Sequence, residues 1–101
     1  MTIRSERLDQ NSIVVFLSGR LDTSSAHELE LVLKPLADGT ADITLDFKDL
    51  DYISSLGLHV LLRTYKEMSV SERKFVVKNM GEQVRAVFEM TGFMSLIAQE
   101  E

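Results

Sequence analysis

Two adjacent serines and a glycine, in Ser54-Ser55-Leu56-Gly57, are the residues whose types and spacing most clearly permit chemistry. They separate a strand-like segment from a helix-like one, which places the serines at the start of a helix. The first turn of a helix has backbone N–H groups without intrahelical partners and a partial positive charge. A serine there can cap the helix, and the same position favours an added phosphate. Both interpretations stay open, and Gly57 leaves room beside the Ser55 hydroxyl for another backbone or a nucleotide.

Two other groups of residues suggest chemistry less strongly. Ser55 and His59 have the i, i+4 spacing of a nucleophile and a base, but no third group orients them, so a hydrolase is disfavoured. Asp46, Asp49 and Asp51 resemble a magnesium cup, yet their spacing matches no standard calcium loop, and we expect solvated turn acids. The chain has no cysteine and only two histidines. These counts exclude disulfides, thiolate metal sites, cysteine nucleophiles and a multi-histidine metal site. With the hydrolase and the magnesium cup both disfavoured, we expect no metal, no cofactor and no enzymatic activity.

The length and composition are those of one globular domain. The chain has 101 residues, of which 45% are hydrophobic and 27% are charged, and we assign residues 1–101 to one domain. The formal net charge of −5, with scattered basic residues, makes nucleic acid an unsuitable partner. No apolar run approaches the roughly 20 residues that cross a bilayer, and the first residues are polar. We expect a soluble, cytoplasmic protein with no membrane insertion.

The pattern of apolar residues predicts strands alternating with helices. Strands are predicted at 4–8, 13–17, 42–47 and 74–78, and helices at about 23–36, 55–68 and 81–91, before an apolar tail at 93–97. Ser25 and Glu28 have the spacing of a capping box for the first helix. Two initial strands followed by alternating helices and strands describe a small α/β sandwich.

The helix after Ser55 has two apolar sides. Its main stripe, which should face the core, consists of Leu58, Leu61, Leu62, Tyr65 and Met68. Leu56 and Val60 fall on the opposite side, where they would form an exposed patch beside Ser55. Such a patch suggests a docking surface, although single exposed apolar residues are also normal.

Residues 46–62, DFKDLDYISSLGLHVLL, resemble the signature of the STAS domain of bacterial anti-sigma-factor antagonists. Residues 19–22, Gly-Arg-Leu-Asp, resemble a second motif of that family, and the order of elements agrees over nearly the whole chain. The resemblance implies a STAS-like sandwich, with a mixed sheet of about four to five strands and three or more helices.

The resemblance also implies a protein-binding switch. In that family the unmodified protein sequesters an anti-sigma factor, which is also a serine kinase. This kinase phosphorylates the STAS protein, and a phosphatase later removes the phosphate. The implied acceptor is Ser55, with Ser54 as the alternative because the best-known members have Asp at that place. The implied partner-binding residues are Asp22, Thr23, Ser54, Leu56, Gly57, His59, Val60 and Arg63, supported by Asp46.

Two alternatives remain from the sequence. One is a constitutive STAS scaffold subunit of a lipid-transport or stress-signalling complex, which needs no phosphorylation. The other, more distant, is a magnesium-dependent phosphate-handling enzyme that would use Asp22 and Asp46.

Overall fold

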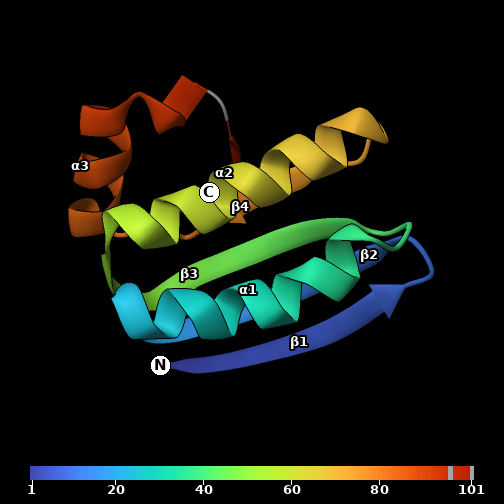
Figure 1. Ribbon diagram of the computed structural model, residues 1–101, viewed down its shortest axis with the longest axis horizontal. Helices are drawn as coiled ribbons and strands as arrows, with labels where there is room; N and C mark the ends of the chain where they lie inside the picture. Colours follow the sequence, from blue (N-terminus) through green and yellow to red (C-terminus); the bar gives the residue numbers. More distant parts are fainter. Residues whose placement is uncertain (96, 101) are drawn as a thin grey trace.

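The computed structural model describes residues 1–95 and 97–100, and it has an α/β architecture (Figure 1). The strands are β1 (Thr2–Asp9), β2 (Ser12–Leu21), β3 (Asp42–Ile53), β4 (Phe75–Lys78) and β5 (Ala98–Glu100). The helices are α1 (Thr23–Ala37), α2 (Ser55–Val70) and α3 (Glu82–Thr91), followed by the 3-10 turn η1 (Phe93–Ser95). The predicted fold class is confirmed.

The strands form one mixed sheet in the order β1-β2-β3-β4-β5. β1 and β2 are antiparallel and joined by a short turn, whereas the later neighbours are parallel. Parallel neighbours need a crossover connection, and α1 and α2 supply it between β2 and β3 and between β3 and β4. The C-terminal ends of β2 and β3 therefore lie at the same edge of the sheet, where α1 and α2 begin.

The main core lies between the sheet and the helices. α1 and α2 run side by side in front of the sheet in Figure 1. Beneath them Leu45 pairs with Val15 and Val77, so these three buried side chains share one face. Phe88 of α3 completes this core, with its ring edge-on to Phe47 at 6.2 Å between centroids.

β3 is longer than the sequence predicts. It continues to Ile53 because its second half still pairs with β2 and because Leu50 and Ile53 are buried. Asp49 and Asp51 therefore lie on a strand, with exposed side chains, and the expectation that they occupy a turn is wrong.

α1 begins with a different cap from the predicted one. The N-cap is Asp22, whose carboxylate accepts a hydrogen bond from the Ser25 N–H at 3.0 Å. In return the Asp22 N–H donates to the Ser25 hydroxyl at 2.9 Å. The capping box therefore joins Asp22 and Ser25, and the predicted pair of Ser25 and Glu28 is wrong.

Candidate phosphorylation and docking site

Ser54 is the cap of α2. Its backbone is extended, with φ −90° and ψ 168°, and its hydroxyl accepts a hydrogen bond from the Gly57 N–H at 3.1 Å. Its carbonyl accepts the first helical bond, from the Leu58 N–H at 3.0 Å. The structural interpretation of the serine pair therefore applies to Ser54, whose hydroxyl is already engaged.

Ser55 is the first residue of α2, and its side chain is exposed. Its hydroxyl makes no hydrogen bond within the described residues. It is not needed as the helix cap, because the Ser54 hydroxyl already accepts the Gly57 N–H. Among the residues that the structure describes, the N–H groups of Ser55 and Leu56 have no acceptor at this helix end. A phosphate on Ser55 would meet these donors and the positive end of the helix dipole.

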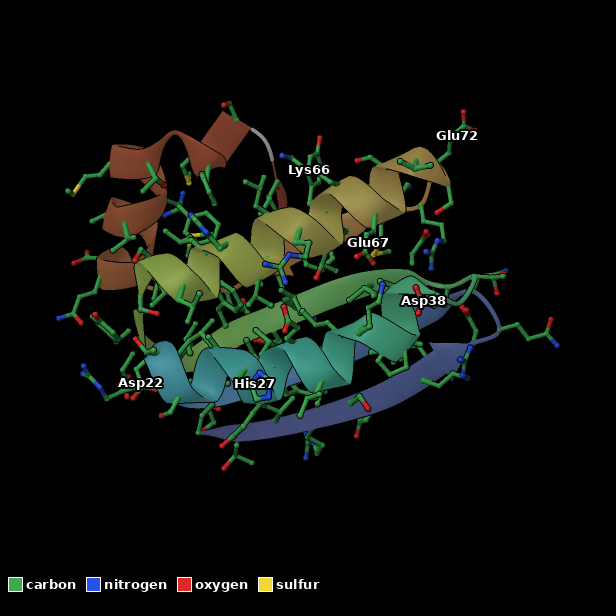
Figure 2. The ribbon with its side chains drawn as sticks, in the orientation of Figure 1. Asp22, His27, Asp38, Lys66, Glu67 and Glu72 are labelled. Atoms are coloured by element: carbon green, nitrogen blue, oxygen red, sulfur yellow. The ribbon has the colours of Figure 1, made fainter. Side chains whose placement is uncertain are left out.

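Asp22 lies beside this serine pair. The N–H of Ser54 donates to the carbonyl of Leu21 at 2.8 Å, so the two strand–helix junctions are in direct contact. Figure 2 shows Asp22 at the start of α1. Hydrogen bonds from the Ser25 N–H, the Ser25 hydroxyl and the Ser24 hydroxyl hold the pKa of Asp22 down at about 2. The Asp22 carboxylate therefore stays negatively charged beside the serine pair, and it already accepts the hydrogen bonds that cap α1.

Gly57 is buried, and it packs against the sheet. A Cβ at this position would lie 2.7 Å from Cγ of Leu21 and 3.2 Å from Cγ1 of Ile53. The glycine therefore lets α2 approach β2 and β3 closely. The expectation that Gly57 leaves room beside the Ser55 hydroxyl for another backbone or a nucleotide phosphate is wrong, because the space left by the missing side chain faces Leu21 and Ile53.

The prediction that Leu56 and Val60 are both exposed on α2 holds only for Leu56. Leu56 is 42% exposed, but Val60 is only 5% exposed and belongs to the core. α2 is covered by the sheet on one side and by α1 on another, so its buried arc is wider than a single stripe. Thr64, one turn after Val60, is buried too and donates to the Val60 carbonyl at 3.0 Å. The prediction of an exposed Val60 is therefore wrong.

Two adjoining hollows lie between α1 and α2, and together we call them the α1–α2 groove. The hollow near Ser55 has a volume of about 210 Å³ and is lined by Ala26, His27, Glu30, Leu56, Val60 and Arg63. The next has a volume of about 330 Å³ and is lined by Glu30, Leu31, Lys34, Val60, Arg63, Thr64 and Glu67. Ion pairs cross the groove from α1 to α2, Glu30 with Arg63 and Lys34 with Glu67.

Leu31, at the rim of this groove, is a surface residue that the sequence interpretation missed. It is 63% exposed. Its position outside the Leu29 and Leu33 stripe of α1 was the signal that could have found it. Of the other predicted partner-binding residues, Thr23, His59 and Arg63 are exposed.

Asp46 is buried, at 7% exposure, and its bonds are those of a structural residue. It accepts hydrogen bonds from the Lys48 N–H at 2.9 Å and from the Asn79 amide at 3.1 Å, and Lys78 lies 3.9 Å away. These contacts connect β3 to the end of β4. None of these contacts reaches Ser54 or Ser55.

The described residues contain no cluster of histidine and acidic side chains able to hold a metal ion. Over the same ranges, 1–95 and 97–100, none of the helices combines the length and apolarity that crossing a bilayer requires.

Comparison with known proteins identifies the family. The model of the STAS domain matches residues 3–100. This chain belongs to the STAS family. The anti-sigma-B factor antagonist of Bacillus subtilis (strain 168) is 33% identical over 89 residues, which cover 88% of this chain and 82% of that protein. The anti-sigma-B factor antagonist of Staphylococcus aureus (strain NCTC 8325) is 31% identical over 88 residues, covering 86% and 82%.

Solved STAS structures show the same fold. The anti-sigma factor antagonist SpoIIAA in its unphosphorylated form matches with a TM-score of 0.84 at 20% identity, over 99% of this chain and 89% of that one. The Bacillus SpoIIAA in its phosphorylated form matches with a TM-score of 0.78 at 18% identity, over 99% and 92%. The family and the non-enzymatic character of anti-sigma factor antagonists agree with the predictions from the sequence.

Proposed function

We propose that this STAS protein binds an anti-sigma factor that is also a serine kinase, and that phosphorylation of Ser55 ends the binding until a phosphatase removes the mark. The observation that carries the proposal is the exposed, uncommitted hydroxyl of Ser55 at the positive end of α2, next to a serine that already caps the helix. The names of the two anti-sigma-B factor antagonists, and the existence of a phosphorylated SpoIIAA, support it. This role belongs in the cytoplasm.

The physical basis of the switch is that the folded domain tolerates a phosphate on Ser55, whereas a protein interface that covers Ser55 does not. A phosphate adds about −1.5 to −2 charges at neutral pH. The exposed position of Ser55, at a helix N-terminus, lets the fold accept this charge. An interface that covers Ser55 would have to desolvate the phosphate beside ionised Asp22, which weakens binding by about 100-fold or more.

The proposed docking surface consists of the exposed side chains around Ser55. On α2 these are Leu56, His59 and Arg63, and at the start of α1 it is Thr23. Leu31 extends the surface along the α1–α2 groove. Gly57 and Val60 support it from beneath, and Asp22 and Ser54 fix the two helix starts.

Ser54 favours a second candidate function. It stands where the best-known switch members have Asp, so a kinase that reads that carboxylate would not find it here. A constitutive scaffold, a STAS subunit of a lipid-transport or stress-signalling complex, would use the same docking surface without modification of Ser55.

Phosphate mapping separates the two functions. The chain is incubated with host lysate and ATP, and phosphate is located by mass spectrometry in the wild type, Ser54→Ala and Ser55→Ala. The switch predicts a mark that Ser55→Ala abolishes and Ser54→Ala retains, although loss of its cap makes Ser54→Ala about 1 kcal/mol less stable. Ser55→Asp should stay folded and capture about 100-fold less partner. A mark on Ser54 would reassign the acceptor, and stable capture with no mark in any variant would support the scaffold.

A further inference from the structure

The outer edge of β1 has no partner strand in this sheet. β1 stands at one end of the strand order, and within residues 1–95 and 97–100 its one partner is β2. In Figure 1 it follows the lower border of the sheet, outside α1. Backbone N–H and C=O groups along such an edge are a template for pairing with another strand.

The usable part of this edge is short and well defined. The register of β1 against β2 is regular from Thr2 to Arg7 and then shifts before Asp9, which places a bulge at Leu8. A bulge turns the following backbone away from a flat pairing edge. A second strand could therefore pair along residues 2–7. If that strand belongs to a second copy and the pairing is centred on Ser5, residues 3–7 of the two copies face each other.

The charges on this edge are complementary to themselves. Arg4 and Glu6 are both exposed, and as residues two apart on a strand they point to the same face of the sheet. If two copies meet edge to edge around a two-fold axis through Ser5, Arg4 of each copy lies directly opposite Glu6 of the other. Two oppositely charged cross-strand pairs then stabilise the contact.

The same charges oppose every neighbouring register. A two-fold axis perpendicular to the sheet keeps each side chain on its own face, so a residue can change its partner only by two positions at a time. Each such change moves the axis by one residue, from Ser5 to Arg4 or to Glu6. One such shift sets the two copies of Arg4 against each other, and the opposite shift does the same for Glu6. Of these three registers, the one with its axis through Ser5 avoids facing like charges and pairs Arg4 with Glu6 twice, so the charges favour that pairing.

We propose that two copies of this chain associate through antiparallel pairing of their β1 strands around Ser5, which makes one sheet continuous through both copies. The strand has two arginines and two acidic residues, so it is locally neutral in a chain of net charge −5. The guanidinium of Arg4 lies over the ring of Phe16, 4.5 Å from its centroid, which holds it on the sheet face where Glu6 of the second copy would meet it. The pairing leaves the α1–α2 groove and Ser55 free, so it does not depend on the function proposed above.

Charge reversal tests the pairing in the full chain. Sedimentation over a concentration series should show reversible dimers for the wild type, and Arg4→Glu or Glu6→Arg alone should weaken them by about tenfold or more. The double variant should dimerise again. A mixture of the two single variants should form heterodimers, because both cross-strand pairs are then attractive.

Cross-linking tests the register independently. The chain has no cysteine, so Ser5→Cys introduces a single thiol. Directly opposed residues in an antiparallel pair have Cα atoms about 4.5–5.5 Å apart, within disulfide range. Mild oxidation should link Ser5→Cys into dimers but not the exposed loop variant Thr40→Cys. A monomeric wild type would overturn the proposal and leave the edge to a strand of another protein, and dimers insensitive to charge reversal would assign dimerisation to another surface.

Discussion

Asp22 combines a structural task with a place in the candidate site. Its carboxylate accepts hydrogen bonds from the backbone and hydroxyl of Ser25 and from the hydroxyl of Ser24, which caps α1. These donors favour the ionised form, and they lower the pKa from its ordinary value of 3.8 to about 2. At the residue scale, the charge next to Ser55 is therefore fixed by the cap of the neighbouring helix.

This cap predicts a pH-dependent stability. The pKa of Asp22 is lower in the folded state, so its stabilisation is fully present above 3.8 and is lost as the pH falls through about 2. Asp22→Asn keeps a capping side chain but removes the charge. The melting temperature of the variant should be lower than that of the wild type at pH 7, and the gap should close as the pH falls from about 4 to about 2.

The exposed strand residue Asp51 offers the matched control, since it caps no helix. Asp51→Asn should differ little from the wild type at any pH. A gap for Asp22→Asn that stays constant down to about pH 2 would mean that geometry, and not charge, makes this cap effective.

At the scale of an element, α2 carries the buried core residue Val60 and, one turn earlier, Leu56 of the proposed docking surface. Val60→Ala removes core atoms between α2 and α1 and should lower the free energy of unfolding by about 1–3 kcal/mol, measured by urea denaturation. Leu56→Ala removes a partly exposed side chain and should cost less than about 1 kcal/mol. In a pull-down from host lysate, Leu56→Ala should nevertheless capture less partner.

The opposite pattern, with Val60→Ala harmless to stability and Leu56→Ala strongly destabilising, would show that the buried arc of α2 has been placed on the wrong side. Equal partner capture by Leu56→Ala and the wild type would remove Leu56 from the docking surface.

At the scale of the whole molecule, Arg73 connects elements far apart in the sequence. From the segment between α2 and β4, its guanidinium donates to the carbonyls of Leu36 at 3.3 Å and Ala41 at 3.2 Å, and also to that of Ala37. These carbonyls lie at the C-terminal end of α1 and just before β3. The contacts fasten the ends of α1 and α2 remote from Ser55, where a cation also complements the helix dipole.

Arg73→Ala should therefore lower the free energy of unfolding by about 1–3 kcal/mol in urea denaturation. Arg73→Lys keeps the charge but replaces the two separate guanidinium nitrogens of the planar fork by a single ammonium nitrogen, so it should recover only part of the loss. The exposed residue Lys66, which Figure 2 shows on α2, is the control, and Lys66→Ala should change stability by less than about 0.5 kcal/mol. Full recovery in Arg73→Lys would mean that charge alone stabilises this end.

The local pattern of residues was enough to predict the elements from β1 to α3 and their order, but not β5. Apolar periodicity placed three helices and four strands, and the motif around Ser55 placed a strand–helix junction where β3 meets α2. These predictions succeeded because each depends on neighbours within a few residues along the chain. The assignment of Ser55 as phosphoacceptor stays a prediction from that motif.

Tertiary contacts decided which side chains face outward. Val60 is buried because α1 covers a second side of α2, and Gly57 faces Leu21 because β2 lies directly beneath the start of that helix. Ser54 and Ser55 could not be separated by residue type, since both suit a cap. Burial depends on elements that come together only in the folded chain, so a periodicity within one helix determines its main stripe but not the full width of its buried arc.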